Sequence, residues 1–336
     1  MVIRRPVLAL ASAALLLASL VSAQPAEQAR KLSNDEKKEL QVITTLLAAP
    51  QPPANDLALA WVGSDLLKAQ GNKEYVPFTI ALDPSRLTGR TIGLYWRVVS
   101  KTAPPPDPKA KKDERAPLYA FENFHVVDVE PGGTLKLSRS FVVPPGDYDL
   151  YVVAKEPEPK KKSDGPARAG VLRQAISVPD LWNGELTTSS VIVAERIDPL
   201  PAPLTPLQQE ERPYALGNME IEPAAGTRFA KKNELTVFLL IYNARVDASN
   251  APDVVVEYNF YNVANGSEKF FNKTNPQALN AQTLQPGFDV ASGMTNGQTI
   301  PLASFPEGDY RMEIKITDKL ATRSITRDVK FTVTGS

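Results

Sequence analysis

The chain has 336 residues, which is enough for two domains of ordinary size, each with its own core. Its 38 Lys and Arg side chains balance its 38 Asp and Glu side chains, so no overall charge favours nucleic acid or an anionic membrane as a partner. It contains no cysteine and one histidine, which excludes disulfides and zinc sites rich in Cys and His.

The first residues have the pattern of an export signal. Arg4 and Arg5 precede an apolar run over 7–21, and Val21-Ser22-Ala23 offers small residues to a signal peptidase, so we expect a signal peptide over 1–23. The alternatives are a twin-arginine signal and a retained membrane anchor, for which the apolar run is short. We therefore expect an exported protein, periplasmic or extracellular, with no transmembrane segment in the mature chain.

A short helix is predicted in the segment 24–55. Ser33 and Glu36 form a capping-box pattern, and the apolar residues that follow recur at spacings of three and four (Leu40, Ile43 and Leu47). We expect the helix to run from about Asn34 to Ala48 and to end before the prolines at 50, 52 and 53. It either packs on its own chain or holds a partner.

Two regions of short alternating runs follow, with no helical pattern between the runs. The first region, 56–197, contains predicted strands at 75–82, 92–99, 119–129, 134–143, 148–154 and 170–178, and an edge strand at 190–196. Four prolines predict an extended linker over 198–213 (Pro199, Pro201, Pro203 and Pro206). The second region, 214–336, contains predicted strands at 234–244, 253–263, 299–305, 310–318 and 323–333. The sequence thus predicts a mainly β protein of two tandem antiparallel Ig-like β-sandwiches.

One turn-and-strand pattern occurs in both regions. "PPGDYDLYVV" contains Tyr148 and "PEGDYRMEIK" contains Tyr310, and aligning them makes "GLYWRVV" resemble "VEYNFYN". In Ig-like sandwiches a tyrosine at the start of the penultimate strand can hydrogen-bond back across the corner. We therefore assign a structural role to two matching turns, formed by Gly146, Asp147 and Tyr148 and by Gly308, Asp309 and Tyr310.

A resemblance to a group of bacterial proteins covers most of 56–334. It is carried by "SVPDLWNGELTTSSVIVAE", by "RPYALGNMEIEPAAGTRFAKKNELTVFLLIYNA" and by the two P-x-G-D-Y turns. These resemble poorly characterised exported proteins with Ig-like or fibronectin-like sandwiches, found beside von Willebrand A or GWxTD-type regions. The chain has neither the Gly-Trp-x-Thr-Asp motif nor an intact metal-ion-dependent adhesion motif. The resemblance implies a fold and export, and no activity.

The sequence offers little for catalysis. His125 lies in an alternating strand, and no nucleophile, phosphate loop or dinucleotide motif accompanies it, so we predict no enzyme, no cofactor and no metal. A hydrolase with an acidic pair that the sequence does not single out stays an alternative.

Two loops and three tryptophans are candidate partner-binding features. The loops, 101–115 and 155–168, carry a small positive excess; their candidate residues are Lys109, Lys111, Lys112, Lys160, Lys161 and Lys162. They either touch an anionic surface or are solvated insertions. Trp61, Trp96 and Trp182 either form a platform for sugar or fill the core.

The sequence-based hypothesis is an exported, non-catalytic binding or structural protein of the bacterial cell envelope, acting through protein–protein contacts. Its expected partner is another envelope protein or a surface polymer, and not nucleic acid. The alternative is a carbohydrate-binding or glycan-processing accessory protein, for which exposed, coplanar tryptophans would be the distinguishing feature.

Overall fold

The structure is a computed structural model that describes residues 32–49, 55–103, 118–130, 132–159, 165–284 and 288–335. The predicted signal peptide over 1–23 and the six candidate lysines, at 109, 111, 112, 160, 161 and 162, lie outside these residues. The described chain is mainly β and divides into two compact units, each an antiparallel β-sandwich apart from one short parallel pairing. The predicted fold class is confirmed.

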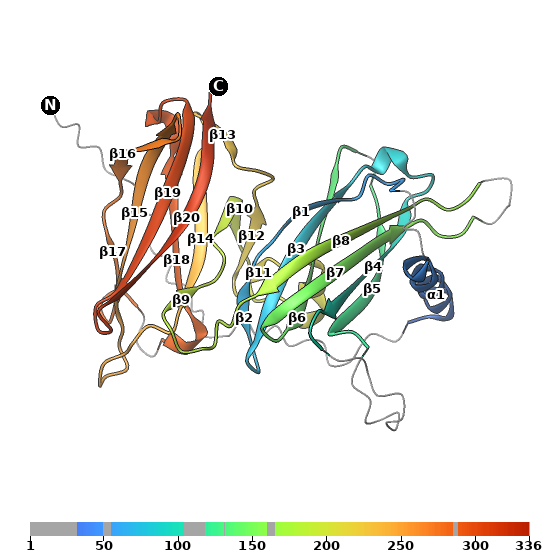
Figure 1. The fold of residues 1–336 in the computed structure, drawn as a ribbon, viewed down its shortest axis with the longest axis horizontal. Coiled ribbons are helices and arrows are strands. Elements are labelled where there is room, and N and C mark those ends of the chain that lie inside the picture. The colour runs from blue at the N-terminus through green and yellow to red at the C-terminus, as the bar shows by residue number, and fades with distance from the viewer. Residues whose placement is uncertain are drawn as a thin grey trace. The chain divides into compact units, whose positions relative to one another are not determined.

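The first sandwich comprises the described parts of Ala23–Asp180 and Pro206–Pro213 (Figure 1). In one sheet β3 (Lys73–Leu82) pairs on one side with β1 (Ala60–Ser64) and β2 (Leu67–Ala69), and on the other with β6 (Leu135–Val143). The second sheet has the order β5 (Phe121–Asp128), β4 (Thr91–Ser100), β7 (Gly146–Lys155), β8 (Ala169–Val178). A 3-10 turn, η1 (Pro84–Arg86), follows β3.

Alternation along the strands builds the core of this sandwich. Every second residue of β4 and β7 is buried between the sheets (Leu94, Trp96, Val98, Leu150, Val152 and Ala154), as a strand with one inward face requires. Trp96 lies against Phe78 of the facing sheet, with ring centroids 6.4 Å apart. Its indole nitrogen donates to the carbonyl of Ser140 (3.0 Å), so its polar atom is satisfied inside the core.

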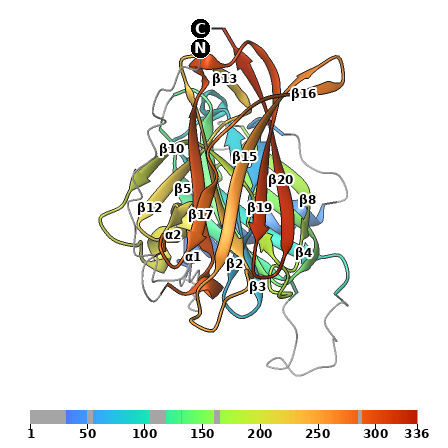
Figure 2. The same cartoon turned by 90° about the vertical axis from the view of Figure 1, so that its left-hand side faces the viewer.

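The second sandwich comprises Leu181–Thr205 and the described part of Tyr214–Ser336. One sheet has the order β11 (Ala215–Leu216), β12 (Met219–Pro223), β10 (Ile192–Pro199), β14 (Glu234–Tyr242), β18 (Met294–Pro301), and β9 (Thr187–Thr188) also pairs with β14. The other has the order β13 (Arg228–Ala230), β20 (Arg323–Thr334), β19 (Gly308–Asp318), β15 (Asp253–Ala264), β16 (Ser267–Lys273), and β17 (Gln277–Asn280) also pairs with β15 (Figure 2). The 3-10 turns are η3 (Val290–Ser292) and η4 (Leu302–Ser304).

The repeated Gly-Asp-Tyr turn forms the same contact in both sandwiches. The Tyr148 hydroxyl donates to the carbonyl of Pro144, and the Tyr310 hydroxyl donates to the carbonyl of Pro306, each at 2.9 Å. The preceding glycines have positive φ angles, 155° at position 146 and 142° at position 308, which side chains disfavour. These are the contacts of a tyrosine corner, which the sequence predicts for this turn.

The N-terminal helix, α1, spans Asn34–Ala48, which confirms the predicted bounds. Ser33 and Glu36 form both hydrogen bonds of the capping box. The helix packs on its own chain, against β4 of the first sandwich (Figure 1).

Two predictions about the domain boundary are wrong. The segment 190–196 was expected to be an edge strand of the first sandwich, whereas β10 pairs with β12 and β14 of the second. The expected extended linker over 198–213 contains helix α2 (Pro206–Glu211), which belongs to the first unit. An alternating run predicts a strand but does not specify the partner with which that strand pairs.

Candidate functional site

Helix α1 covers part of the outer face of the sheet β5-β4-β7-β8. Ile43 is fully buried there against Tyr95, Phe124 and Val153, with further leucines of the helix around it. The nearly buried ammonium of Lys155 lies 2.9 Å from Glu39 of the helix. The rest of this outer face carries polar and aromatic side chains.

The uncovered part of the face carries a row of alternating tyrosine and arginine side chains on neighbouring strands, which we call the Tyr–Arg ladder (Tyr119, Arg97, Tyr151 and Arg173). The Arg97 guanidinium lies 4.7 Å from the ring centroid of Tyr119 and 5.0 Å from that of Tyr151. The Arg173 guanidinium lies 5.6 Å from the Tyr151 ring. Guanidinium groups at such distances are attracted to the negative faces of the rings.

Arg97 has few polar partners for a half-buried cation. Its Nη1 donates to the Tyr119 hydroxyl at 2.8 Å, whereas its Nε is buried without a hydrogen-bond partner among the described residues. Glu122 stands opposite Arg97 across the strand pair, but its carboxylate accepts a hydrogen bond from the Tyr95 hydroxyl at 2.9 Å. Within the described part of the chain, no carboxylate forms an ion pair with Arg97.

Asp149 on β7 holds the other cations of this face. Arg173 lies 2.7 Å from its carboxylate, and Lys101 lies 3.7 Å from it. The hydrogen bond from Arg173 holds the pKa of Asp149 below its usual value, so this carboxylate stays charged at neutral pH. Asp149 is therefore paired with Arg173 and Lys101, and it forms no ion pair with Arg97.

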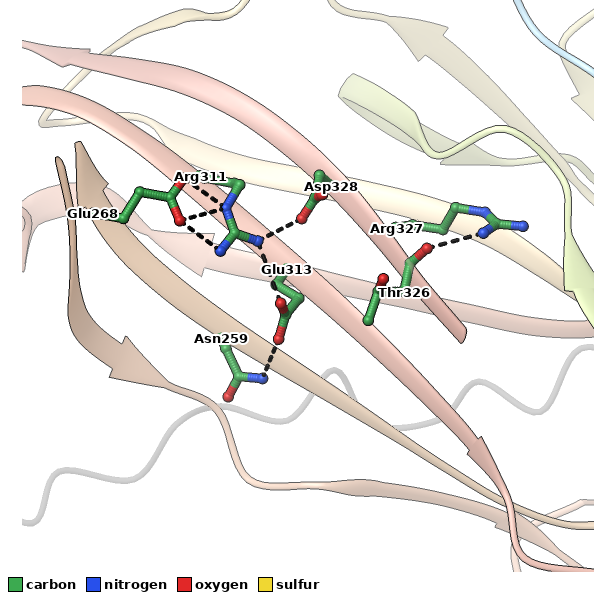
Figure 3. Close-up of polar contacts among 7 residues, drawn as sticks. All are labelled: Asn259, Glu268, Arg311, Glu313, Thr326, Arg327 and Asp328. Atoms are coloured by element: carbon green, nitrogen blue, oxygen red, sulfur yellow. Dashed lines mark hydrogen bonds and ion pairs between the residues drawn. The ribbon is translucent and has the colours of Figure 1, made fainter. Parts of the chain in front are cut away.

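The corresponding face of the second sandwich carries a closed ion-pair cluster (Figure 3). Arg311 lies 4.5 Å above the Tyr261 ring and bonds to three carboxylates, those of Glu268 (2.8 Å), Glu313 (3.3 Å) and Asp328 (2.6 Å). The hydrogen bonds that Arg311 donates to the Glu268 carboxylate raise the pKa of Arg311, whereas its partial burial acts to lower it. All three nitrogens of this guanidinium thus donate hydrogen bonds to carboxylates of the same chain.

Aligning the two tyrosine corners shows that one ion pair recurs with its charges exchanged. One residue after each corner tyrosine stands Asp149 in the first sandwich and Arg311 in the second. Strand register places Arg173 opposite Tyr151, and Asp328 opposite Glu313, at equivalent positions. The first sandwich thus joins acid on β7 to base on β8, and the second joins base on β19 to acid on β20.

The same alignment explains where α1 lies. Tyr95 and Val153, which α1 covers, form a cross-strand pair equivalent to Glu257 and Lys315 of the second sandwich. That second pair is an ion pair with 3.8 Å between charged atoms. Covering Tyr95 and Val153 with α1 removes apolar surface from water, whereas the charged pair of the second sandwich has no such gain from a cover.

Helix α2 docks on the first sandwich through polar contacts. Glu210 of the helix lies 3.1 Å from Nε2 of His125, and the carbonyl of Pro213 accepts a hydrogen bond from Tyr75 (2.9 Å). Burial lowers the pKa of Arg139, while the charges of Glu211 and Glu210 act against that shift. His125 also stands edge-on to Trp96, at 5.1 Å, so the single histidine takes part in packing.

The three candidate tryptophans lie in different settings. Trp96 is core, Trp61 is half-buried and stacked on Phe78 at 5.8 Å, and Trp182 is half-buried in the second sandwich. The ladder residues were not candidates from the sequence, because they lie on separate strands and only the register brings them together. The outward position of Arg97, between two inward residues of an alternating strand, was the available signal.

Within the described ranges, no group of three or more His, Cys, Asp or Glu side chains is arranged to hold a metal ion. None of the helices that the structure describes combines the length and apolar character needed to cross a membrane.

The chain is thus a pair of β-sandwiches, each with a tyrosine corner. No protein-family model and no curated protein matches it. Among solved structures, it is similar to Escherichia coli alpha-2-macroglobulin activated by porcine elastase, with 10% identity and a TM-score of 0.24 over 78% of this chain and 22% of that one. It is also similar to Salmonella alpha-2-macroglobulin reacted with methylamine, with 13% identity and a TM-score of 0.21 over 84% of this chain and 17% of that one. A third similar structure is red sea bream transglutaminase, with 10% identity and a TM-score of 0.19 over 91% of this chain and 35% of that one.

The chain spans from 17% to 35% of the length of these structures. Similarities with identities and TM-scores this low assign no activity, substrate or partner to the chain.

Proposed function

We propose that the protein is an exported, non-catalytic binding protein of the bacterial cell envelope that acts through protein–protein contacts. The observation that carries this proposal is the Tyr–Arg ladder, where Arg97 stacks on Tyr119 and Tyr151 beside the part of the face covered by α1. Tyrosine and arginine are enriched at the residues that dominate binding energy in protein interfaces. The pattern at 1–23 supports export, and the absence of cysteine favours a bacterial over a eukaryotic exported protein.

A protein partner is favoured over a carbohydrate. A sugar-binding platform needs exposed aromatic faces, but Trp96 is in the core, and guanidinium groups stack on the rings of Tyr119 and Tyr151. The Trp61 ring is stacked on Phe78. These contacts leave few free ring faces on the first sandwich for a sugar to stack on.

The test is crosslinking in cells followed by a pull-down from envelope fractions. A double variant, Tyr119→Ala with Tyr151→Ala, should lose the partner that the unchanged protein recovers. Arg196→Ala is the matched control, because Arg196 is an exposed arginine of the second sandwich bonded to Asp198 and Glu222. The control should recover the partner.

A further variant, in which only 104–117 and 160–164 are shortened, removes the six candidate lysines, keeps Lys101, Lys155 and Glu156, and so separates the ladder from the basic loops. Loss of the partner only with shortened loops would move the binding site to the loops and overturn the role of the ladder. A substrate turnover that depends on specific carboxylates would overturn the non-catalytic part of the proposal.

A further inference from the structure

The second sandwich shows what a guanidinium stacked on tyrosine binds in this chain. Arg311 lies over Tyr261 and takes carboxylates from Glu268, Glu313 and Asp328, which leaves 16% of its side chain exposed. Ring stacking fixes the plane of a guanidinium, and its N–H groups then point outward along that plane in a fixed fork. Carboxylates match this fork.

Arg97 has the stacking without the carboxylates. The rings of Tyr119 and Tyr151 flank its guanidinium, Nη1 donates to the Tyr119 hydroxyl, and its Nε is buried with no partner in the described chain. Because Nε is buried, a partner cannot reach it, and the group open to a partner is Nη2, which has no hydrogen bond to any described residue. A charge-assisted hydrogen bond to this group is stronger than one between neutral groups. The neighbouring carboxylates, Asp149 and Glu122, are engaged by Arg173 and Tyr95.

We propose that Arg97 binds the carboxylate of an aspartate or glutamate side chain on an acidic segment of the partner protein. This inference rests on the proposed function, because it names the partner chemistry of the same ladder. Charge complementarity supports it: Arg173 and Lys101 flank the site and share the single carboxylate of Asp149, and 62% of the Arg173 side chain is exposed.

A phosphate group is the other anion that a guanidinium fork can bind. The comparison within the chain favours a carboxylate, because Arg311, which also lies over a tyrosine ring, binds the carboxylates of Glu268, Glu313 and Asp328. We therefore infer an acidic protein segment as the ligand, and the test below includes phosphate as a competitor.

The test is nuclear magnetic resonance of the arginine Nε–Hε groups in the purified protein. The probes are an acetylated peptide with alternating Glu and Ala residues, a Gln–Ala peptide of equal length, and inorganic phosphate. We expect the Glu peptide to shift the Arg97 signal and to bind at least about fivefold more tightly than the Gln peptide or phosphate. Arg97→Lys, which keeps the charge but loses the planar fork, should weaken binding by about five- to tenfold.

Arg196→Lys is the control and should bind the Glu peptide unchanged, because Arg196 lies outside the ladder. The inference is overturned if the Glu peptide leaves the Arg97 signal in place, if phosphate binds as tightly, or if Arg97→Lys binds equally well. The pull-down tests the proposed function separately. If the Tyr119→Ala, Tyr151→Ala variant loses its envelope partner, the proposed function stands whatever the peptide experiment gives. If the double variant keeps that partner, the proposed function is refuted.

Discussion

Replacing Ile43 by alanine should release helix α1 from the first sandwich without unfolding the sandwich itself. Ile43 is the buried residue of this 15-residue helix, and it lies against Tyr95, Phe124 and Val153. Helices of this length are marginal in water without tertiary contacts. Whether α1 stays helical therefore depends on its docking.

The magnitude follows from the burial of the helix. Burial of a whole isoleucine side chain contributes about 1.5–3 kcal/mol, and the flanking leucines are only partly buried. Truncating a buried isoleucine to alanine costs about 2–5 kcal/mol, which is comparable with the whole docking free energy of one helix. Loss of the ion pair between Lys155 and Glu39 does not leave the nearly buried ammonium unpaired, because Lys155 keeps a second carboxylate partner, Glu158, at 2.8 Å.

Hydrogen exchange, read by mass spectrometry, measures this directly. In Ile43→Ala the amides of 34–48 should lose protection, while those of β3 and β4 keep it, and the uncovered Tyr95 and Phe124 should bind a hydrophobic dye. Gln41→Ala, on the exposed side of the helix, is the control and should change the free energy of unfolding by less than about 0.5 kcal/mol. Equal loss of protection across helix and strands would refute the reasoning, because α1 would then be part of one cooperative unit.

Three further predictions concern the corners, the ion-pair cluster and acid stability. Tyr148→Phe and Tyr310→Phe each remove one hydrogen bond of the same length, so each should lower the free energy of unfolding of its own sandwich by about 0.5–1.5 kcal/mol in urea titrations; unequal losses would show that the corners are not equivalent. Arg311→Gln should destabilise the second sandwich by about 1–3 kcal/mol at neutral pH, and by less at pH values that protonate the facing carboxylates; an equal loss at both would contradict the assigned charges. Burial acts to raise the pKa of Glu156, but hydrogen bonds from Thr88, Arg168 and Gly89 lower it. Ionised Glu156 therefore stabilises the folded state above its unfolded pKa of about 4.3, and this stabilisation is lost as the pH falls through its lower folded pKa. In Glu156→Gln the free energy of unfolding should accordingly fall less steeply with acidification below about pH 4.3 than in the unchanged protein.

Local signals in the sequence were sufficient for much of the fold. The helix over 34–48 was predicted to the residue, because its cap, its apolar spacing and the prolines after it are all encoded within about twenty neighbouring positions. Most long strands were predicted for the same reason. The strands β1 and β2 were missed, because "AWVGSDLLKA" does not alternate and contains a glycine at a break in pairing.

Signals that depend on distant partners were less informative. The alternating run that became β10 does not encode which sandwich it joins, and its partner β14 begins about forty residues later along the chain. The sequence comparison also placed "GLYWRVV" one position away from its structural equivalent, since register makes Trp96, and not Tyr95, correspond to Tyr258. A slip of one residue exchanges the two faces of a strand.

The candidate site could not be predicted from the sequence, because it also depends on contacts between distant residues. Arg97, Tyr119 and Tyr151 lie on or beside three different strands, and nothing in the spacing of 97, 119 and 151 predicts that their side chains stack. Helix α2 was hidden by the prolines around it, although Thr205 followed by Pro206 has the form of a helix start. Its docking on His125 and Tyr75 depends on contacts between residues far apart in the chain.

The exchanged ion pair bears on how a chain with two related domains avoids folding incorrectly. Tandem domains of similar sequence are prone to exchange equivalent strands while they fold. If β8 took the place of β20 beside β19, Arg173 would stand where Asp328 stands and would face Arg311. In the reverse exchange Asp328 would face Asp149. Both wrong assemblies bring like charges together on one sheet, so the opposite polarity of the two faces selects for the correct partner during folding.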